Sequence, residues 1–215
     1  MKLPVIKIME PNTMDPFAYL RIDDLTPEEE RTLRDYKAAT PGADGTFACF
    51  TMNRLLEHGL FPDEMGTRGT EVVVLDQIFA RCTPIVKPIT VFRAIGARSN
   101  LPLNKAGARF RNRGFWSTSH SASAADNFLK SESQKGHGAF LTLELPVGLP
   151  AFNMASMEAQ DGDHEGELLL PRGVLWTIKT PQTQTTRSML PGVSKYFESV
   201  VDVTLEASPN VRVQA

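Results

Sequence analysis

Three groups of polar residues interrupt stretches of sequence that otherwise predict β-strands. They are Arg93, the triplet at 117–119, and the pair Glu165 and Glu167. In a strand, residues two apart project from the same face about 6.5–7 Å apart, so both carboxylates would line one cleft. Two carboxylates this close repel each other when both are ionised, unless a cation such as Arg93 or a cationic substrate lies nearby. The pattern therefore favours a site that stabilises positive charge.

Common motifs of catalysis and metal binding do not occur in the sequence. It contains no Walker-type phosphate loop, no Gly-x-Gly-x-x-Gly, no His-Glu-x-x-His and no Gly-x-Ser-x-Gly. The four histidines lie far apart, and the two cysteines, Cys49 and Cys82, are too few for a cysteine-ligated zinc site. We expect both cysteines to be buried thiols and predict no bound metal.

The composition is that of one compact domain without an excess of either charge. Of 215 residues, 41% are hydrophobic and 22% charged, and 23 Lys and Arg stand against 25 Asp and Glu, for a net charge of -2. Neither nucleic acid nor an anionic membrane is therefore expected as a partner. No run approaches the ~18 apolar residues of a membrane span, and the N-terminus shows no Sec signal peptide. We expect a soluble monomer whose export would need another route.

The helical patterns lie in the first part of the chain. Residues 1–26 contain three prolines and predict an extended arm. A Thr-Pro-Glu-Glu-Glu run then starts a helix over 27–39. Further helices are expected over 47–58 and about 70–82, the last with four buried apolar residues, Val73, Leu75, Ile78 and Phe79.

After residue 86 the pattern changes to β-branched, alternating segments. Strands are expected over 89–94, 114–119, 139–145, 167–170, 174–178 and 197–205, with one short helix over 122–130. Helices first and strands later favour the α+β class. Residues 27–215 are predicted to form a single domain, with a helical part at 27–85 and a β-rich part at 86–215.

The ordered set of polar groups resembles the mono-ADP-ribosyltransferase toxins and exoenzymes of the arginine–serine–glutamate class. The match consists of Val91-Phe92-Arg93, of an aromatic-x-Ser-Thr-Ser element over 115–119, and of Glu-x-Glu followed by Leu-Leu-Leu-Pro-Arg-Gly. Tyr36, Asn53 and the helix around 75–79 also occupy family-like places, so the resemblance covers about residues 27–206. It implies the ADP-ribosyltransferase fold, with N-terminal helices packed on a two-sheet mixed β-sandwich.

The resemblance also implies a reaction and a role for each polar group. Members of this family cleave the nicotinamide–ribose bond of NAD and transfer ADP-ribose to a protein side chain, without a metal. Glu167 would stabilise the ribose cation, Ser117 would orient Glu167, and Arg93 would hold a phosphate or ribose of NAD. Further contacts to NAD are implied for five residues, Ala94, Thr118, Ser119, Phe128, which would stack on nicotinamide, and Asn53.

Glu165 indicates which side chain of the target would accept ADP-ribose. In the family, Glu at this position goes with arginine modification and Gln with asparagine modification, so arginine is the default acceptor. The chain lacks an obvious Tyr or Trp near Glu165, and a serine or threonine acceptor, with Glu165 as base, stays open. Residues 151–164 correspond to the target-recognition loop, whose expected contact residues are Phe152, Met154, Met157, Asp161 and Asp163. The Phe and Met side chains either contact the target or pack beneath the loop.

Three functions follow from this resemblance. The first is a bacterial effector or toxin that reaches a host cytosol by a specialised secretion route and modifies a target such as actin, a small GTPase or a ubiquitin-like protein. The second is an NAD glycohydrolase, in which water replaces the target. The third is a catalytically inactive binding module with the same fold.

Overall fold

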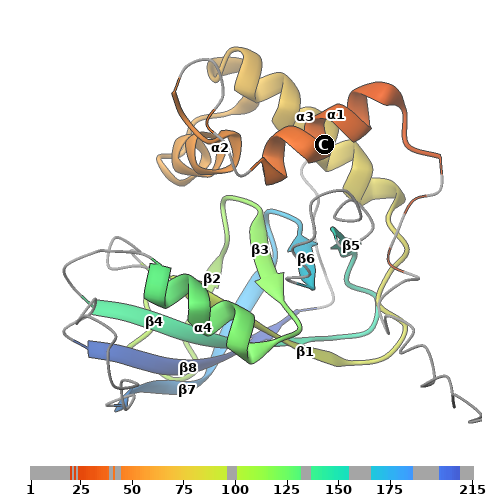
Figure 1. The fold of residues 1–215 in the computed structure, drawn as a ribbon. Helices are drawn as coiled ribbons and strands as arrows, with labels where there is room; N and C mark the ends of the chain where they lie inside the picture. The colour runs from red at the N-terminus through yellow and green to blue at the C-terminus, as the bar shows by residue number, and fades with distance from the viewer. Residues whose placement is uncertain are drawn as a thin grey trace, which may run out of the picture.

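The computed structural model describes most of the chain from Leu20 onward. The described residues are 20, 22, 24–38, 41, 45–95, 101–131, 137–154, 166–185 and 199–208. Three helices form a layer above the upper ends of several strands, and a fourth helix lies against the lower part of the sheet (Figure 1). Within the described residues, every helix is too short or too polar to cross a lipid bilayer.

The described residues form four α-helices and one short 3-10 helix. They are α1 (Pro27–Lys37), α2 (Ala48–Glu57), the 3-10 helix η1 (Pro62–Glu64), α3 (Thr67–Arg81) and α4 (Ala122–Ser131). At the start of α1, Glu29 N–H donates to Thr26 Oγ1 (3.3 Å), and Thr26 N–H donates to Glu29 Oε2 (2.8 Å). This reciprocal cap fixes the first residue of α1.

The strands form a continuous, mostly antiparallel sheet. They are β1 (Ile89–Ile95), β2 (Arg109–Arg111), β3 (Trp116–Ser119), β4 (His137–Leu145), β5 (Phe152–Asn153), β6 (Glu167–Leu170), β7 (Leu175–Thr185) and β8 (Ser199–Ala207). Their order is β2-β7-β8-β4-β1-β3-β6-β5, and β4 pairs with β8 in parallel. The α+β class is confirmed, as is the position of each strand expected from the sequence.

Hydrogen bonding joins the two expected sheets into one. The link is narrow, because β1 and β3 share the single register pair Phe92 and Ser119. On either side of this link the strands run in different directions (Figure 1), and residues from both parts fill the same apolar core. Trp116 of β3 stacks on Trp176 of β7 with ring centroids 5.0 Å apart. The sheet therefore folds over onto itself and encloses a core like that of a sandwich.

A second apolar core lies between the helical layer and the strands β3, β5 and β6. It includes Leu33, Leu75, Phe79, Phe115 and Leu169, all at most 2% exposed. Alternation along the strands separates the two cores, since side chains of consecutive strand residues face opposite sides. The faces of β3 and β6 that meet the helices are thus set by the pleat.

The helical prediction was wrong at one buried position. Val73 of α3 is 42% exposed, whereas Val72 is fully buried together with Leu75 and Phe79. Residues at 72, 75 and 79 lie on one helical face, and residue 73 lies about 100° away from residue 72 on the helix. Because three valines follow one another here, the sequence did not show which of them faces the core.

One bidentate ion pair ties α3 to the segment that follows β6. Arg172 Nη2 donates to Asp76 Oδ2 (2.5 Å), and Arg172 Nε lies 3.0 Å from Oδ1. Both side chains are largely buried, with 16% and 12% of their surface exposed. Burial raises the pKa of Asp76 against the opposing effect of Arg172. The pair therefore connects the helical layer to the sheet. Its stabilising effect requires both partners, because either one alone would be a largely buried charge without a counter-ion.

We expect Asp76→Asn to lower the free energy of unfolding by about 3 kcal/mol, because it leaves a largely buried guanidinium without its counter-ion. Urea denaturation measures the loss. Glu30→Gln is the matched control, since it breaks the exposed Arg34–Glu30 pair of α1, at 2.7 Å, and should cost less than about 0.5 kcal/mol. Equal effects of the two variants would contradict a special role for the Asp76–Arg172 pair.

Candidate functional site

The pairing of β3 with β6 places three of the predicted site residues on one face. Ser119 lies opposite Glu167, and Ser117 lies opposite Leu169. Opposite residues of an antiparallel pair share a face, and diagonal neighbours lie about 7–8 Å apart. Because Leu169 belongs to the core beneath the helical layer, the face with Ser117, Ser119 and Glu167 is the one that meets the helices.

Arg93 reaches this region from β1. Its Nη1 donates to the Ser117 carbonyl oxygen (2.5 Å), and its Cζ lies 5.5 Å from the ring centroid of Trp116. Burial lowers the pKa of the Arg93 guanidinium, while the nearby Tyr36, Glu57 and Glu167 groups act in the opposite direction. Arg93 is thus bonded to the backbone of Ser117 and lies near enough to Glu167 to be influenced by its charge, and the catalytic roles expected of the three residues stay predictions.

The Nε atom of Arg93 has no acceptor within the described part of the chain. It is buried, and no hydrogen-bond partner for it exists among the residues that the structure describes. A buried donor without an acceptor is costly, since it has lost its hydrogen bonds to water. Among the described residues, Arg93 thus keeps one donor unused in the region of Glu167.

A hydrogen-bonded triangle connects α1 and α2 to the start of β3. Asn53 Nδ2 donates to the Tyr36 hydroxyl (3.0 Å), which donates to the Phe115 carbonyl oxygen (3.3 Å). The Phe115 N–H in turn donates to Asn53 Oδ1 (2.9 Å). Asn53 thus has a structural role in this structure, and its expected contact to NAD stays a prediction.

Glu167 has a cationic partner that sequence reasoning missed. Lys37, the last residue of α1, places Nζ 3.5 Å from Glu167 Oε2. A basic residue in the last turn of a helix is ordinarily explained by the helix dipole, so nothing in the sequence singled it out. Lys37 thus joins Arg93 as a second cation beside the predicted catalytic carboxylate.

Two further residues of α2 border the cluster. Burial raises the pKa of Cys49, and Glu167 acts in the same direction on it while Arg93 opposes. Glu57 is close enough to raise the pKa of Arg93. Cys49 is only partly buried, whereas Cys82 is buried as expected, which raises the pKa of its thiol to about 12. Both thiols are held in their neutral, unreactive form.

Gly166, between the two glutamates, has a conformation and a position that exclude other residues. Its φ is +56°, and a Cβ at this position would come within 1.9 Å of the His120 ring. The His120 N–H donates to the Gly166 carbonyl oxygen (3.2 Å), and His120 Nδ1 lies 3.0 Å from the same oxygen. This contact sets where β6, and with it Glu167, begins.

The remaining predicted NAD contacts divide by the face they occupy. The Thr118 side chain points into the core, where its Oγ1 donates to the Leu168 carbonyl oxygen (2.7 Å) and only 4% of the residue is exposed. The Thr118 hydroxyl is therefore already used within the core, and the expected contact of Thr118 to NAD stays a prediction. Ser119 and Ala94 are also buried, at 7% and 6% exposed. Phe128 lies in α4, and its side chain is outside the described residues.

The prediction for the target-recognition loop needs a correction at its first two residues. Phe152 and Met154 are 1% and 0% exposed and belong to the core beneath the helical layer. Phe152 of β5 pairs with Leu169 of β6, and the Met154 N–H, just after β5, donates to the Glu167 carbonyl oxygen (2.9 Å). They support β6 and do not form a contact surface. The other predicted residues, Met157, Asp161, Asp163 and also Glu165, lie outside the described residues.

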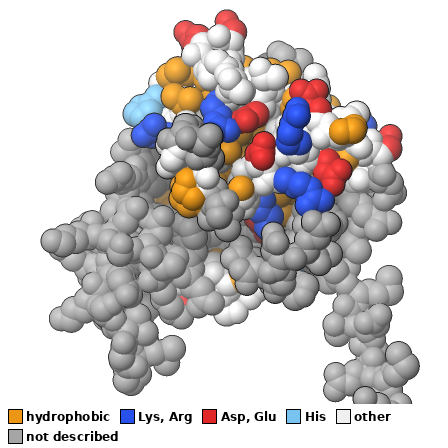
Figure 2. All heavy atoms as spheres, turned by 45° about the horizontal axis from the view of Figure 1, so that its top comes forward, with side chains coloured by type: hydrophobic (Ala, Val, Ile, Leu, Met, Phe, Trp, Pro, Cys, Tyr) orange, Lys and Arg blue, Asp and Glu red, His pale blue; other side chains and the backbone are white. Residues whose placement is uncertain are grey.

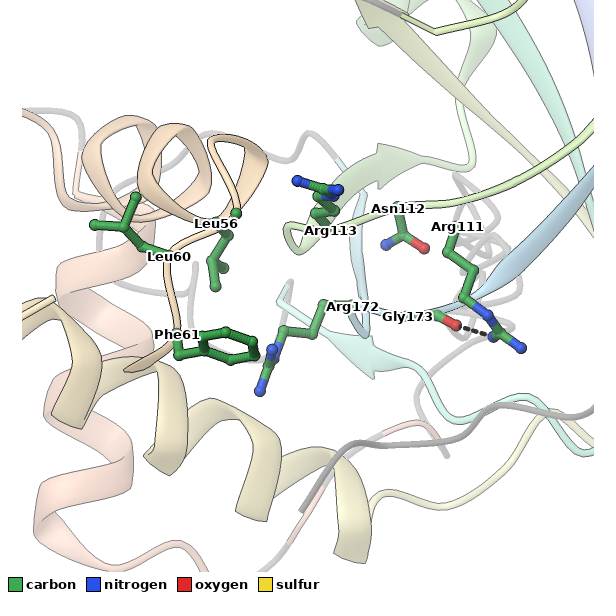
Figure 3. Close-up of a pocket in the computed structure, with 9 residues that line it drawn as sticks. Leu56, Leu60, Phe61, Arg111, Asn112, Arg113, Arg172 and Gly173 are labelled. Carbon is green, nitrogen blue, oxygen red and sulfur yellow. Dashed lines mark hydrogen bonds between the residues drawn. The ribbon is translucent and has the colours of Figure 1, made fainter. Parts of the chain in front are cut away.

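A separate pocket of about 650 Å³ opens where α2 ends. Its lining residues come from α2, from the following turn and from the segments before β3 and after β6: Leu56, Gly59, Leu60, Phe61, Arg111, Asn112, Arg113, Arg172 and Gly173. Arg113 and Arg172 point into this space, whereas Arg111 turns to the Gly173 carbonyl, to which it donates at 2.6 Å (Figure 3). The residues that line the pocket include none of the predicted site.

Buried polar bonds hold the wall of this pocket. Asn112, 2% exposed, donates from Nδ2 to the Gly114 and Pro171 carbonyl oxygens, both at 2.8 Å. Its Oδ1 accepts from Trp176 Nε1 (3.2 Å). One amide thus connects the segments before β3 and after β6 with β7.

The outer face of the helical layer carries basic and acidic groups side by side (Figure 2), so neither positive nor negative charge dominates that surface.

A sequence model of the ADP-ribosyltransferase exoenzyme family matches residues 19–198. The chain belongs to the ADP-ribosyltransferase exoenzyme family. The match includes Arg93, Ser117 and Glu167. Among curated proteins, none matches the sequence. Within the described residues, no three His, Cys, Asp or Glu side chains gather as metal ligands would, and the expected independence from metal stays a prediction.

Solved structures share the fold of this ADP-ribosyltransferase at low identity. Plx2a, an ADP-ribosyltransferase toxin from Paenibacillus larvae, is 19% identical with a TM-score of 0.58, over 86% of this chain and 87% of that chain. Vis, from Vibrio splendidus, solved with agmatine, is 14% identical with a TM-score of 0.61, over 90% and 80%. BECa of C. perfringens, solved with NADH, is 19% identical with a TM-score of 0.58, over 87% of this chain and 45% of that chain.

We expect Gly166→Ala to lower the free energy of unfolding by about 2–3 kcal/mol and to reduce NAD turnover, because the new Cβ must displace His120 or β6. Gly148→Ala is the matched control. Gly148 also has a positive φ, +90°, but a Cβ there meets nothing within 4 Å. The control should show the backbone strain alone, about 1 kcal/mol, with unchanged turnover. If Gly166→Ala behaves like this control in both thermal unfolding and turnover, the His120 contact does not position Glu167.

Proposed function

We propose that this exoenzyme is a mono-ADP-ribosyltransferase that takes ADP-ribose from NAD and attaches it to a side chain of a target protein. The observation that supports the proposal is that Arg93 Nη1 donates to the Ser117 carbonyl oxygen while Ser117 and Glu167 share the face of β3 and β6 beneath the helical layer, with Arg93 Nε lacking an acceptor among the described residues. Because these groups come from three separate strands, this arrangement is not a consequence of proximity in sequence.

Glu167 supplies the charge that the reaction needs. When the bond between nicotinamide and the ribose C1′ breaks, its electron pair leaves with nicotinamide, and the ribose becomes an oxocarbenium ion. A carboxylate held beside this developing positive charge, in a site that excludes water, lowers the barrier by about 3 kcal/mol or more. Ser117, on the same face two positions along the ladder, is suited to hold the carboxylate or a ribose hydroxyl in place.

Arg93 is suited to bind the phosphates of NAD. Its guanidinium presents a planar fork of donors, and phosphate oxygens match this fork. The contact to the Ser117 carbonyl oxygen fixes one arm, while Nε remains buried without an acceptor among the described residues. An oxygen of bound NAD would satisfy this donor and offset its desolvation.

The acceptor is proposed to be an arginine side chain. Glu165 precedes Glu167 by two residues, and a carboxylate there orients a guanidinium and accepts the proton that is lost when its nitrogen bonds to C1′. The Vis structure holds agmatine, which carries the guanidinium group of arginine, and this supports the choice. A serine or threonine hydroxyl is the alternative acceptor that uses the same base.

The setting proposed for this activity is that of a secreted toxin or effector. The solved structures of the same fold include toxins from Paenibacillus larvae and C. perfringens. We propose that the protein acts as a monomer in the cytosol of a host cell, on a protein such as actin, a small GTPase or a ubiquitin-like protein. Mass spectrometry of a host lysate incubated with NAD would identify both the target and the modified side chain.

The two glutamates should separate hydrolysis from transfer. We expect Glu167→Ala to lower both NAD hydrolysis and protein labelling by about 10³-fold, because the ribose cation loses its carboxylate. Glu165→Ala should remove labelling and keep part of the hydrolysis, since water needs less activation at an oxocarbenium than a guanidinium does. Radiolabelled NAD with a host lysate measures both activities in one experiment.

Glu206→Ala is the control for this experiment. Glu206 pairs with Lys179 at 2.7 Å on the far strands β8 and β7, and both side chains are about half exposed. Its loss should change neither activity. Transfer that survives in both Glu167→Ala and Glu165→Ala would refute the proposed roles, and free ADP-ribose from the wild type without any labelled protein would favour a glycohydrolase.

A further inference from the structure

We propose that the pocket where α2 ends is a ligand site separate from the one proposed for NAD, and that its ligand is a mononucleotide, a phosphate monoester with a planar ring. The pocket is the one that Arg113, Arg172 and Phe61 line (Figure 3). None of the described residues around it belongs to the predicted NAD site. The inference therefore does not rest on the proposed function.

The size and walls of the pocket suit a small molecule. Its volume of about 650 Å³ falls in the range of about 300–1,000 Å³ that is usual for small-ligand sites. The end of α2 and the turn after it form an apolar side with Leu56, Leu60 and Phe61. Arg113, from the segment before β3, and Arg172, from the segment after β6, form a cationic side. Such sites combine an apolar wall with a few polar groups that orient the ligand.

Arg113 brings a positive charge without a counter-ion. Its Nη1 donates a long hydrogen bond, of 3.4 Å, to the Glu57 carbonyl oxygen. Of the ion pairs between described residues, none includes Arg113 or Arg111. The described lining residues also include no Asp or Glu. Arg113 thus faces the pocket with most of its donors available.

Arg172 uses only part of its guanidinium on Asp76. Its Nε and Nη2 bind the carboxylate, and among the described residues no acceptor bonds to its Nη1. Because a guanidinium presents five N–H groups in a rigid fork, it can hold one anion and still donate to another. The Asp76 pair therefore fixes the orientation of a second cation that points into the pocket (Figure 3).

The charge of the pocket fits a phosphate monoester better than a carboxylate. Asp76 compensates Arg172, whereas Arg111 and Arg113 have no carboxylate within 4 Å in the described part of the chain. A phosphate monoester carries about 1.5–2 negative charges at pH 7, which matches these two cations. A single carboxylate would neutralise only one of them. Phosphate oxygens also match the donor fork of arginine.

Phe61 is the reason to expect a planar ring on this phosphate. Its side chain is 65% exposed, although it lines a pocket together with Leu56 and Leu60. A base stacked on phenylalanine would cover this apolar surface, and such stacking commonly strengthens binding about tenfold. Inorganic phosphate would leave the ring in water. A mononucleotide carries both groups that the two sides of the pocket recognise.

Titration calorimetry with uridine monophosphate and guanosine monophosphate tests the assignment, because neither base occurs in NAD. We expect the wild type to bind one molecule of nucleotide. Arg113→Met and Phe61→Ala should each weaken binding about tenfold, since one removes a charge-assisted hydrogen bond and the other a stacking surface. Uridine and inorganic phosphate each carry one of the two recognised groups, and each should bind at least tenfold more weakly than uridine monophosphate.

Two further variants are matched controls. Arg109→Met removes an exposed arginine of β2 that does not line the pocket, and Phe50→Ala removes a phenylalanine of α2 that is 56% exposed. Neither should change the affinity. All four altered side chains are exposed, so each variant should keep its melting temperature within about 2 °C of the wild type.

Each outcome either supports or overturns the proposal. Weaker binding in the two pocket variants and not in the two controls supports it. Unchanged binding in the pocket variants would place the nucleotide elsewhere. Inorganic phosphate that binds as tightly as the nucleotides, with no effect of Phe61→Ala, would overturn the choice of ligand. No binding of either nucleotide at millimolar concentration would overturn the proposal, and binding of the peptide Phe-Asp-Asp in its place would assign the pocket to an acidic protein partner.

Discussion

The antiparallel register between β3 and β6 is the constraint on which the rest of the site depends. It places Glu167 opposite Ser119 and leaves Ser117 on the same face. A shift of β6 by one residue would turn Glu167 to the opposite face and bring Leu168 under the helices. The buried leucines of β6, the contact of His120 with Gly166 and the bonds of Asn112 all act against such a shift.

The polar cluster is stable because the fold surrounds it with fixed partners. Trp116 covers one face of Arg93, and the Ser117 carbonyl oxygen accepts from its Nη1. Burial raises the pKa of the Tyr36 hydroxyl and so keeps it neutral. Among the described residues, the site thus combines neutral neighbours with the cations Arg93 and Lys37 and the carboxylates Glu167 and Glu57.

The sequence predicted this site as far as local patterns reach. Period-two alternation identified the strands that carry Arg93, Ser117 and Glu167, because each side chain's face follows from the pleat alone. For Phe152 and Met154 the sequence left contact with a target and burial as two alternatives, because the choice depends on β5 pairing with β6, which leaves no local signature in two residues. Lys37 was missed for a similar reason, because its contact joins a helix end to a strand 130 positions away.

Asn112 shows how a residue far from the substrate can be as intolerant of change as a catalytic one. Its amide saturates two carbonyl oxygens and one indole N–H inside the protein. A leucine of similar size would leave all three partners buried without a hydrogen bond. An aspartate would place two acceptor oxygens opposite two carbonyl oxygens, which are acceptors as well. A survey of sequence variants would therefore mark position 112 as essential, although Asn112 is required for the fold and takes no part in the reaction.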